Sequence, residues 1–309
     1  MKTIHSARRN EINIFIAGAS GAIGQPLITE LVRKGHSVTG MTRSEASAQM
    51  LRMLGATAVI VDVFNAVAVE SALRQSQAEV VIDELTALPK DPRDMPKYQA
   101  GDRKVRLEGG GHLHRAAQAC GVRRYIQQST GFFLHSGDGL ADESEGLAID
   151  ASPSVATSSQ TYTTLESRVL GSMEGVALRY GFFYGPNTWY HPDGSAVDQV
   201  RAQQLPLIGD GEGMWNWVHI EDAALATVAA LNCEPGIYHA VQDEPSPMRE
   251  WLPAFCRFVG APAPNRFSVD DARKLAGEDA VYYPTKLRGA SNAKAKRVLG
   301  FKPRKLEWL

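Results

Sequence analysis

Lysine is missing from the middle of this 309-residue chain, where none stands between Lys104 and Lys274. A lysine ammonium often serves as a catalytic amine or as a point charge for a phosphate group. Any chemistry in this section of the chain therefore proceeds without an ammonium group.

An excess of charge of one sign is also missing. The chain has 33 basic and 34 acidic residues and a net charge of −1. Such a balance provides no field that would hold nucleic acid or an anionic membrane surface. We expect neither as a partner, and we expect a small molecule as the ligand.

Cysteines and long apolar runs are scarce. The three cysteines, Cys120, Cys233 and Cys256, form no CxxC pair, which fits a reduced cytoplasmic chain. The apolar run INIFIAGA is too short to span a bilayer, and the first residues, MKTIHSARRNE, contain no apolar run typical of a signal peptide. The sequence predicts a cytoplasmic protein.

What the chain does have is an alternation of strand and helix patterns. Residues 12–18 form a continuous apolar run, typical of a strand buried on both faces, and residues 21–35 place apolar side chains on one helical face. Repeated units of this kind predict a parallel sheet covered by helices on both sides. The predicted strands are 12–18, 36–43, 56–63, 78–88, 122–130, 174–180 and 236–241, and the predicted helices are 21–35, 44–55, 66–76, 97–120, 158–173, 247–260 and 290–299. Residues 209–231 are predicted to run from a turn into a strand and then an amphipathic helix.

The predicted fold is an α/β, Rossmann-type, doubly wound parallel sheet with a smaller C-terminal substrate lobe. Residues 1–185, joined by 218–242, are predicted to form the dinucleotide-binding domain. Residues 186–217 and 243–309 are predicted to form the substrate-binding lobe. The polar stretch 137–159 predicts a long mobile loop.

The strongest local motif is Gly18-Ala-Ser-Gly21-Ala-Ile-Gly24, which follows a predicted strand and opens a predicted helix. Glycines there permit a tight turn and a close approach to a pyrophosphate, and the helix start supplies free N–H groups. The alternative is a glycine-rich turn without a ligand.

The end of the second predicted strand bears on the choice of cofactor. An acidic residue there would bind the ribose 2′-hydroxyl of NAD, but the sequence has Arg43 followed by Ser44. A guanidinium pairs well with a 2′-phosphate. We predict NADP, with NAD as the alternative.

Several separated segments together resemble the extended short-chain dehydrogenase/reductase superfamily of the NAD-dependent epimerase/dehydratase type. They are AGASGAIG, VIVDV, YIQQST, LRYGFFYGP, PLIGDGEGMWNWVHIEDAALATVAAL and RVLGFKPR, in this order over nearly the whole chain. The resemblance implies an NAD(P)-binding oxidoreductase and a set of cofactor contacts. These are Gly18, Ser20, Gly21, Ala22, Ile23, Gly24, Arg43, Ser44, Asp62, Val63, Leu85, Thr86, Ala87 and Tyr162.

The catalytic set of that superfamily is Asn, Ser or Thr, and a YxxxK pair, and this chain departs from it. The Ser/Thr position falls on Thr130, next to Ser129. With Glu166 as a landmark, Tyr162 occupies the lysine position and Ser158 the tyrosine position. The other register makes Tyr162 the catalytic tyrosine and puts Glu166 in place of the lysine.

In either register the lysine is absent, and Arg106 stands at the asparagine position. In the family this lysine binds the nicotinamide ribose and lowers the pKa of the tyrosine. A phenol without that help titrates near 10, so only about one in a thousand is ionised at pH 7. Such a tyrosine is a poor base but still a proton donor.

These departures favour an NADPH-dependent reductase of a carbonyl or an activated alkene, in a small molecule or a sugar-nucleotide-like substrate. Thr130 or Tyr162 would donate the proton, and Tyr162 would otherwise bind the ribose. The alternatives are a non-catalytic NADP-binding regulatory protein, or an epimerase or isomerase with a rebuilt acid–base set that uses Glu84.

Three further residues are predicted near the substrate. Glu84 would be an acid of raised pKa or an ion-pair partner of Arg106, and Tyr184 would line the floor of the site. We predict no metal site, because His112 and His114 are two residues apart on a helix and point to different faces. Helices near 97–120 and 158–173 suggest a homodimer.

Overall fold

The structure is a computed structural model that describes residues 11–309. The prediction that the N-terminus is not a signal peptide falls mainly on residues 1–10, which lie outside the described residues.

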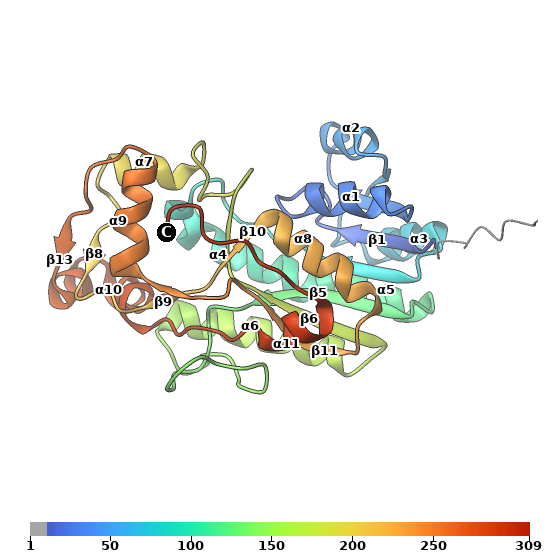
Figure 1. Cartoon of the computed structure of the whole chain (residues 1–309). Coiled ribbons are helices and arrows are strands. Elements are labelled where there is room, and N and C mark those ends of the chain that lie inside the picture. Colours follow the sequence, from blue (N-terminus) through green and yellow to red (C-terminus); the bar gives the residue numbers. More distant parts are fainter. Residues whose placement is uncertain (1–10) are drawn as a thin grey trace, which may run out of the picture.

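A seven-stranded sheet in which every neighbouring pair is parallel forms the larger part of the fold (Figure 1). The strand order reverses between β1 and β4, which makes that point the topological switch of the sheet. The predicted fold class is confirmed. Across the sheet the strands are β11 (Gly236–Ala240), β6 (Glu174–Tyr180), β5 (Arg124–Thr130), β4 (Val80–Asp83), β1 (Asn13–Ala17), β2 (Ser37–Thr42) and β3 (Thr57–Ile60).

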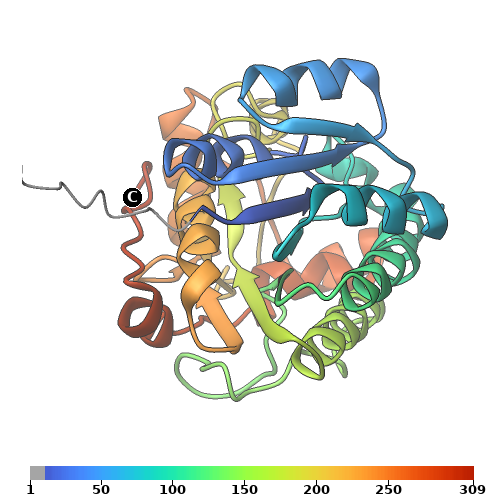
Figure 2. The same ribbon diagram turned by 90° about the vertical axis from the view of Figure 1, so that its right-hand side faces the viewer.

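Helices cover both faces of this sheet, as Figure 2 shows. Buried side chains on each face form a separate apolar cluster with the helices that cover it. One face carries α1 (Gly24–Arg33), α2 (Glu45–Met53) and α8 (Ile220–Ala229), and the other carries α3 (Ala66–Ser76), α5 (Gly110–Ala119) and α6 (Pro153–Leu170).

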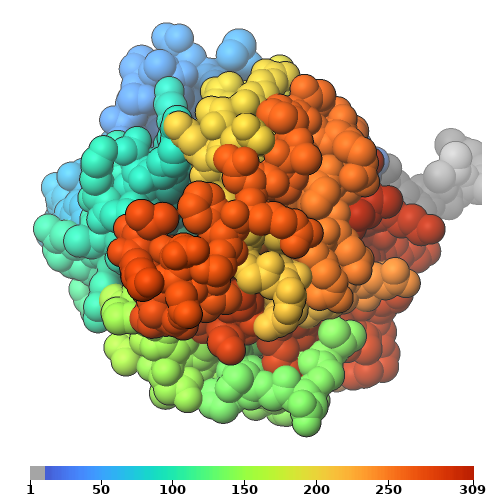
Figure 3. Space-filling view, turned by 90° about the vertical axis from the view of Figure 1, so that its left-hand side faces the viewer, coloured from blue at the N-terminus to red at the C-terminus, as the bar shows by residue number. Residues whose placement is uncertain are grey.

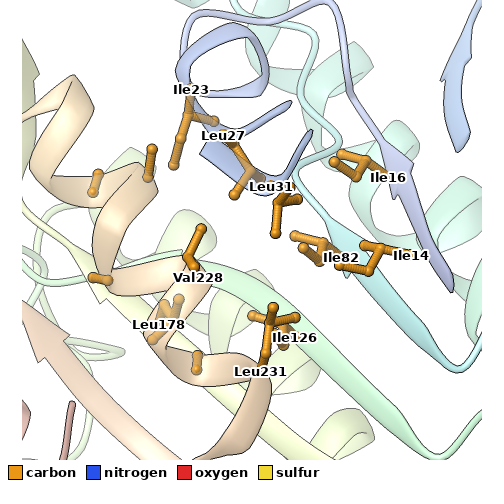
Figure 4. Packing of buried hydrophobic residues seen from close by; sticks show 14 of the residues in the cluster. Ile14, Ile16, Ile23, Leu27, Leu31, Ile82, Ile126, Leu178, Val228 and Leu231 are labelled. Carbon is orange, nitrogen blue, oxygen red and sulfur yellow. The ribbon is translucent and has the colours of Figure 1, made fainter. Parts of the chain in front are cut away.

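The cluster beneath α1 and α8 holds the glycine loop in place (Figure 4). Leu27 and Leu31 of α1 pack against Ile14 and Ile16 of β1, and Val228 of α8 closes the other side. Burying each of these large aliphatic side chains stabilises the fold by about 1.5–3 kcal/mol. The start of α1 is therefore fixed relative to the end of β1.

The long helix predicted at 97–120 exists, but a π-helical turn interrupts it. The turn, η2 (Val105–Gly109), lies between α4 (Met95–Lys104) and α5. π-Helical turns inside α-helices are frequent at functional sites. This one contains Arg106.

A smaller lobe packs beyond the carboxyl ends of the strands, at the left of Figure 1. In Figure 3, which faces the lobe, the orange surface of its C-terminal helices covers much of the view and meets the teal surface of the α4 region. The lobe has its own aromatic-rich core. Its elements are α7 (Ser195–Arg201), α9 (Met248–Phe258) and α10 (Val269–Lys286), with the strand pairs β7 (Phe182–Tyr184) with β10 (Trp217–His219), β8 (Leu207–Ile208) with β13 (Arg266–Phe267), and β9 (Met214–Trp215) with β12 (Ser246–Pro247).

Two segments of the C-terminal part return to the main sheet. Strand β11 pairs with β6, and α8 packs against α1. Helix α11 (Ala293–Leu299) then lies against β11. Among residues 11–309, no helix has both the length and the apolar character that crossing a bilayer requires.

Sequence reasoning missed α10 and misjudged one loop. Gly277, which adopts φ 77°, and Pro284 lie inside α10 and hide the helical pattern, although Ser268 accepts a hydrogen bond from the Asp271 N–H as a helix cap would. The stretch predicted as a mobile loop is held instead by Arg288, which donates to the carbonyl oxygens of residues 135, 138 and 139, and α6 begins early, at Pro153.

Candidate active site

The glycine loop lies at the switch point of the sheet. Gly18 has φ 80°, and a Cβ atom there would lie 2.3 Å from the carbonyl oxygen of Glu84 at the end of β4. A Cβ on Gly24 would lie 2.2 Å from the carbonyl oxygen of Ala19. The Gly21 N–H donates to the Gly18 carbonyl at 3.0 Å and closes the turn. Only glycine fits the two crowded positions.

The start of α1 presents free amide groups beside this turn. The N–H groups of Ala22 and Ile23 donate to no acceptor within residues 11–309, and Ser20 and Gly21 are at least partly exposed. Free N–H groups at a helix start favour a bound anion. The loop therefore fits the diphosphate of a dinucleotide, which it would hold with backbone amides.

The end of β2 carries a free cation. Arg43 is exposed, and within the described part of the chain its guanidinium forms no hydrogen bond or ion pair. The Ser44 hydroxyl accepts from the Ser47 N–H at 3.2 Å and so caps α2. Arg43 remains available for a ligand phosphate, whereas Ser44 already has a structural role.

The residues after β3 are fixed by local contacts. Asp62 is exposed, and its carboxylate accepts from the Phe64 N–H at 3.0 Å. The Val63 carbonyl accepts from His112 Nδ1 at 3.0 Å, while His114 Nε2 lies 2.8 Å from the Ser172 hydroxyl. Burial lowers the pKa of His114 to about 4. Both histidines therefore bind neighbouring parts of the fold.

The loop after β4 is tied to α4. The Leu85 N–H donates to Asp83 at 3.1 Å, and the Ala87 N–H donates to Asp102 Oδ1 at 2.7 Å. Thr86, between them, is half-buried and forms no hydrogen bond through its side chain within the described residues. One oxygen of Asp102 therefore holds the loop, and the other accepts a hydrogen bond from a neighbouring cation.

That cation is Arg106, which is only 3% exposed. Its Nε donates to Asp102 Oδ2 at 2.7 Å, and its Nη1 lies 3.5 Å from Gln128 Oε1. The guanidinium carbon lies 4.9 Å from the centre of the Tyr162 ring, which is cation–π geometry. The structure thus places a buried positive charge against Tyr162, from a different helix than the missing lysine.

The predicted Glu84–Arg106 ion pair is wrong. Glu84 turns towards Tyr180 of β6, and its Oε1 accepts from the Tyr180 hydroxyl at 3.2 Å, which also contacts Thr227 of α8. The buried Oε2 of Glu84 has no partner among the described residues. Burial raises the pKa of Glu84 to about 8. Arg106 instead pairs with Asp102, which precedes it by four residues on the same helix.

Tyr162 is half-buried on α6. Its hydroxyl forms no hydrogen bond with any described residue. Burial raises its pKa above the ordinary value of 10, although the nearby Arg106 charge opposes that effect. Tyr162 is therefore protonated at neutral pH and can donate a proton.

The structure gives Ser129 and Thr130, the two candidates at the Ser/Thr position, different surroundings. The Ser129 hydroxyl donates to Glu166 at 2.6 Å, and Glu166 forms a buried ion pair with Arg179 at 2.7 Å. Successive strand residues point to opposite faces. Thr130 therefore points away from this ion pair, and its hydroxyl has only a 3.5 Å contact with the Phe132 N–H.

Tyr184, which was predicted to line the floor of the site, lies in the core of the lobe. Its hydroxyl donates to the Lys305 carbonyl oxygen at 3.2 Å, and its ring packs against His219 and Trp308. The side chain is buried in the core of the lobe and binds the C-terminal segment.

Sequence reasoning missed the two phenylalanines of an aromatic stack beside the strand ends. The Phe132 and Phe182 rings stack with their centres 4.0 Å apart, and Phe182 stacks on Trp215 at 4.2 Å. The sequence does contain a pattern that points to this stack: the tripeptide Gly-Phe-Phe follows β5 at residues 131–133 and β6 at residues 181–183. These two strands are parallel neighbours.

The comparisons with known proteins agree with this geometry. The model of the NAD dependent epimerase/dehydratase family matches residues 14–240. A 3-diazoavenalumate denitrifying reductase of a Streptomyces species is 37% identical over 96% of this chain and 98% of its own. A 2-alkyl-3-oxoalkanoate reductase of Stenotrophomonas maltophilia is 27% identical over 81% of this chain and 77% of its own.

Solved structures share the fold at low sequence identity. The UDP-glucose 4-epimerase of Thermus thermophilus, solved in complex with NAD, is 23% identical and has a TM-score of 0.70 over 94% of both chains. The corresponding enzyme of Thermotoga maritima is 19% identical and has a TM-score of 0.73 over 96% of this chain and 94% of its own.

The sheet, the glycine loop and the family match define the class of the protein, an oxidoreductase- or epimerase-like enzyme of the extended short-chain dehydrogenase/reductase type. The chain belongs to the NAD dependent epimerase/dehydratase family.

Proposed function

We propose that this protein is an NADPH-dependent reductase of a carbonyl or an activated alkene in a small molecule. Tyr162 donates the proton and Thr130 supports it. The bound nicotinamide dinucleotide supplies the hydride, so that hydride and proton together saturate the double bond.

The observation that carries the proposal is the Tyr162–Arg106 pair. The Tyr162 hydroxyl is protonated and has no partner among the described residues, as a proton donor requires. The Arg106 charge lies 4.9 Å from the ring centre and stabilises the phenolate that remains after the proton has left. The carboxylate whose charge acts on Tyr162, that of Asp102, already accepts from Arg106 and from the Ala87 N–H, so it is not free to act as the base that oxidation of an alcohol would need.

The relatives favour reduction as well. Both curated relatives described above are named as reductases, and the name of the second refers to an oxo compound. A third, a dihydroquinoline-1-oxide ketoreductase of Stigmatella aurantiaca, is 22% identical over 77% of this chain.

Arg43 supports NADP over NAD. It stands at the end of β2 where an acidic residue would favour NAD, and it is an exposed cation free to pair with a 2′-phosphate. A charge-assisted hydrogen bond of this kind contributes about 1.5–3 kcal/mol.

The lobe arrangement remains part of the proposal. Residues 1–185 and 218–242 would bind the cofactor, and residues 186–217 and 243–309 would bind the substrate. A cytoplasmic location and a homodimer through α4–α5 and α6 remain predictions.

The epimerase alternative that uses Glu84 has weaker support. The Glu84 side chain is 4% exposed and is directed towards Tyr180 under α8. A regulatory NADP-binding protein stays as the second candidate because the tyrosine–lysine pair is absent.

The deciding experiment measures binding and turnover together. The wild-type protein is titrated with NADPH and NADH by calorimetry, and the loss of NADPH absorbance is followed with a panel of ketones, aldehydes and enones. The proposal requires binding of NADPH and turnover that Tyr162→Phe lowers at least about 100-fold. NADPH binding without turnover of any substrate would favour the regulatory alternative.

A further inference from the structure

The repeated Gly-Phe-Phe tripeptides place two phenylalanines side by side. Thr130 of β5 lies in register with Tyr180 of β6, so the residues after these strands emerge together at the same edge of the sheet. The result is a stack of parallel rings. Phe132 stacks on Phe182 and Phe182 on Trp215, with centre distances of 4.0 and 4.2 Å and interplanar angles of 20° and 27°. Trp217 lies beside both Trp215 and Phe182, with centre distances of 5.4 and 5.7 Å.

One end of the stack, Phe132, lies two residues beyond Thr130 in the chain. Phe132 and Phe182 are half-buried, whereas both tryptophans are buried. The Phe132 N–H is 3.5 Å from the Thr130 hydroxyl. Apart from Phe182 and the edge of Phe133, no ring of the described residues contacts Phe132. A flat ligand at this position would extend the stack by one ring.

Two unused hydrogen-bond donors lie nearby. Arg106 is only 3% exposed, yet the structure gives partners only to its Nε and Nη1 atoms, and Nη2 donates to no residue in 11–309. The Tyr162 hydroxyl is equally unpartnered among these residues, and its ring packs against the same aromatic core as Phe132. Neither Arg106 Nη2 nor the Tyr162 hydroxyl is among the fully buried polar atoms, so a ligand can reach both donors.

We infer that the substrate is a flat aromatic or conjugated compound with an oxygen acceptor, whose ring extends the stack at Phe132 and whose oxygen accepts from Arg106 Nη2 and Tyr162. The inference rests on the proposed reductase function and names its substrate class. As negative charge develops on the oxygen, Arg106 stabilises it and Tyr162 protonates it.

Binding of two matched acids to the NADP-bound protein tests the ring and the oxygen separately. The probes are 2-naphthoate and its saturated analogue, decahydro-2-naphthoate, measured by calorimetry. An aromatic pair contributes about 0.5–1.5 kcal/mol beyond burial, so we expect 2-naphthoate to bind about threefold to tenfold more tightly. Phe132→Leu should remove this preference, and Phe258→Leu, at an exposed ring on α9, is the matched control.

The oxygen contact is tested on the same two acids. Arg106→Gln keeps a donor for Asp102 and should weaken both acids about 10- to 100-fold, while Arg106→Lys should restore part of the affinity. Arg103→Gln, at an exposed arginine on α4, should change neither. Retained NADPH binding shows that each variant is folded.

The outcomes separate the inference from the proposed function. Equal affinity for the two acids, no binding of either at millimolar concentration, or an Arg106→Gln variant that binds both normally would overturn the inference. Turnover of aliphatic ketones but not of 2-naphthaldehyde would also overturn it while leaving the reductase intact. Failure of every carbonyl compound to consume NADPH would overturn the proposed function itself.

Discussion

At the residue scale, the positive charge beside Tyr162 is the guanidinium of Arg106, because the chain has no lysine in α6. Arg106 reaches Tyr162 from the π-helical turn, whereas a lysine would come from α6 itself. A guanidinium stays charged even when buried and offers a planar set of donors. Arg106 can therefore hold a positive charge beside the phenol while Asp102 fixes its orientation.

The pH dependence of turnover identifies the proton donor. Burial raises the pKa of Tyr162 above 10, so the donor stays protonated and kcat should be constant from about pH 6 to pH 9. Initial rates of NADPH oxidation over this range provide the measurement. A fall in kcat with a midpoint near 8 would instead assign the proton to Glu84, whose pKa is raised to about 8.

Glu84 should also make stability depend on pH. Its pKa rises from 4.5 to about 8 on folding, so its contribution is complete below pH 4.5 and is lost as the pH rises to about 8. Relative to wild type, Glu84→Gln should gain about 3–5 kcal/mol of unfolding free energy between pH 5 and pH 9. Urea unfolding of both proteins at each pH gives the difference.

The control for this prediction is Glu108→Gln, because Glu108 lies on the surface. Its difference from wild type should stay nearly constant with pH. If the Glu84→Gln and wild-type curves also run parallel, Glu84 is already ionised in the folded protein at low pH.

At the element scale, the first strand–loop–helix unit is held by backbone contact. Gly18 touches the end of β4 and Gly24 touches the loop backbone, so α1 sits as close to the sheet as the chain permits. This closeness directs the free N–H groups at the start of α1 towards the switch point. Cofactor binding and packing therefore depend on the same glycines.

Alanine substitutions at Gly18 and Gly35 separate the cost of backbone strain from the cost of a steric clash. Gly35 has a similar φ of 84° but no atom within 4 Å of a built Cβ, so Gly35→Ala should cost only the backbone strain, about 1–2 kcal/mol. Gly18→Ala adds the 2.3 Å clash with Glu84 and should cost at least about 2 kcal/mol more. Chemical denaturation measures both, and equal losses would contradict the packing argument.

The loop before α6 provides a second prediction at this scale. Arg288 donates to three loop carbonyls and pairs with Glu145 of the same loop. Arg288→Met should remove these bonds and speed amide hydrogen exchange in residues 135–146, while exchange in β5 stays slow. Unchanged amide exchange in residues 135–146 would show that apolar contacts hold the loop without the Arg288 hydrogen bonds.

At the scale of the whole molecule, two cores meet at the site. The sheet and its helices bury one set of aliphatic residues on each face, and the lobe buries an aromatic set of its own. Groups from both parts, Arg106 and Tyr162 from the sheet side and the aromatic stack from the lobe side, come together at the carboxyl edge of the strands. Ligands in open α/β sheets bind at this edge.

Cofactor binding should stabilise this assembly as a whole. A ligand present at 100 times its Kd adds about 2.7 kcal/mol, which corresponds to several degrees in Tm for a chain of this size. NADPH should raise Tm more than NADH at equal concentration, and Arg43→Ala should remove the difference. The exposed Arg52→Ala is the matched control, and an equal response to both cofactors in wild type would contradict the NADP assignment.

Local sequence patterns predicted much of the fold. All seven strands of the sheet and the glycine loop were predicted, because apolar runs and glycine spacing act over a few residues. The helix α10 was not, since Gly277 and Pro284 interrupt its pattern. A strand was predicted where β9 and β10 lie, but the other short strands of the lobe were not predicted, because two- or three-residue strands carry no periodicity.

The sequence by itself determined the family, the cofactor class and the identity of Tyr162 and Thr130 as candidates, because motif order and spacing survive without coordinates. Only the tertiary structure decided the partners of the polar groups. Alternation along β5 sends Ser129 to Glu166 and leaves Thr130 free, and the π-helical turn brings Arg106 to Tyr162 from a distant part of the chain. Such contacts depend on how strands and helices turn their side chains in space, which spacing along the chain does not specify.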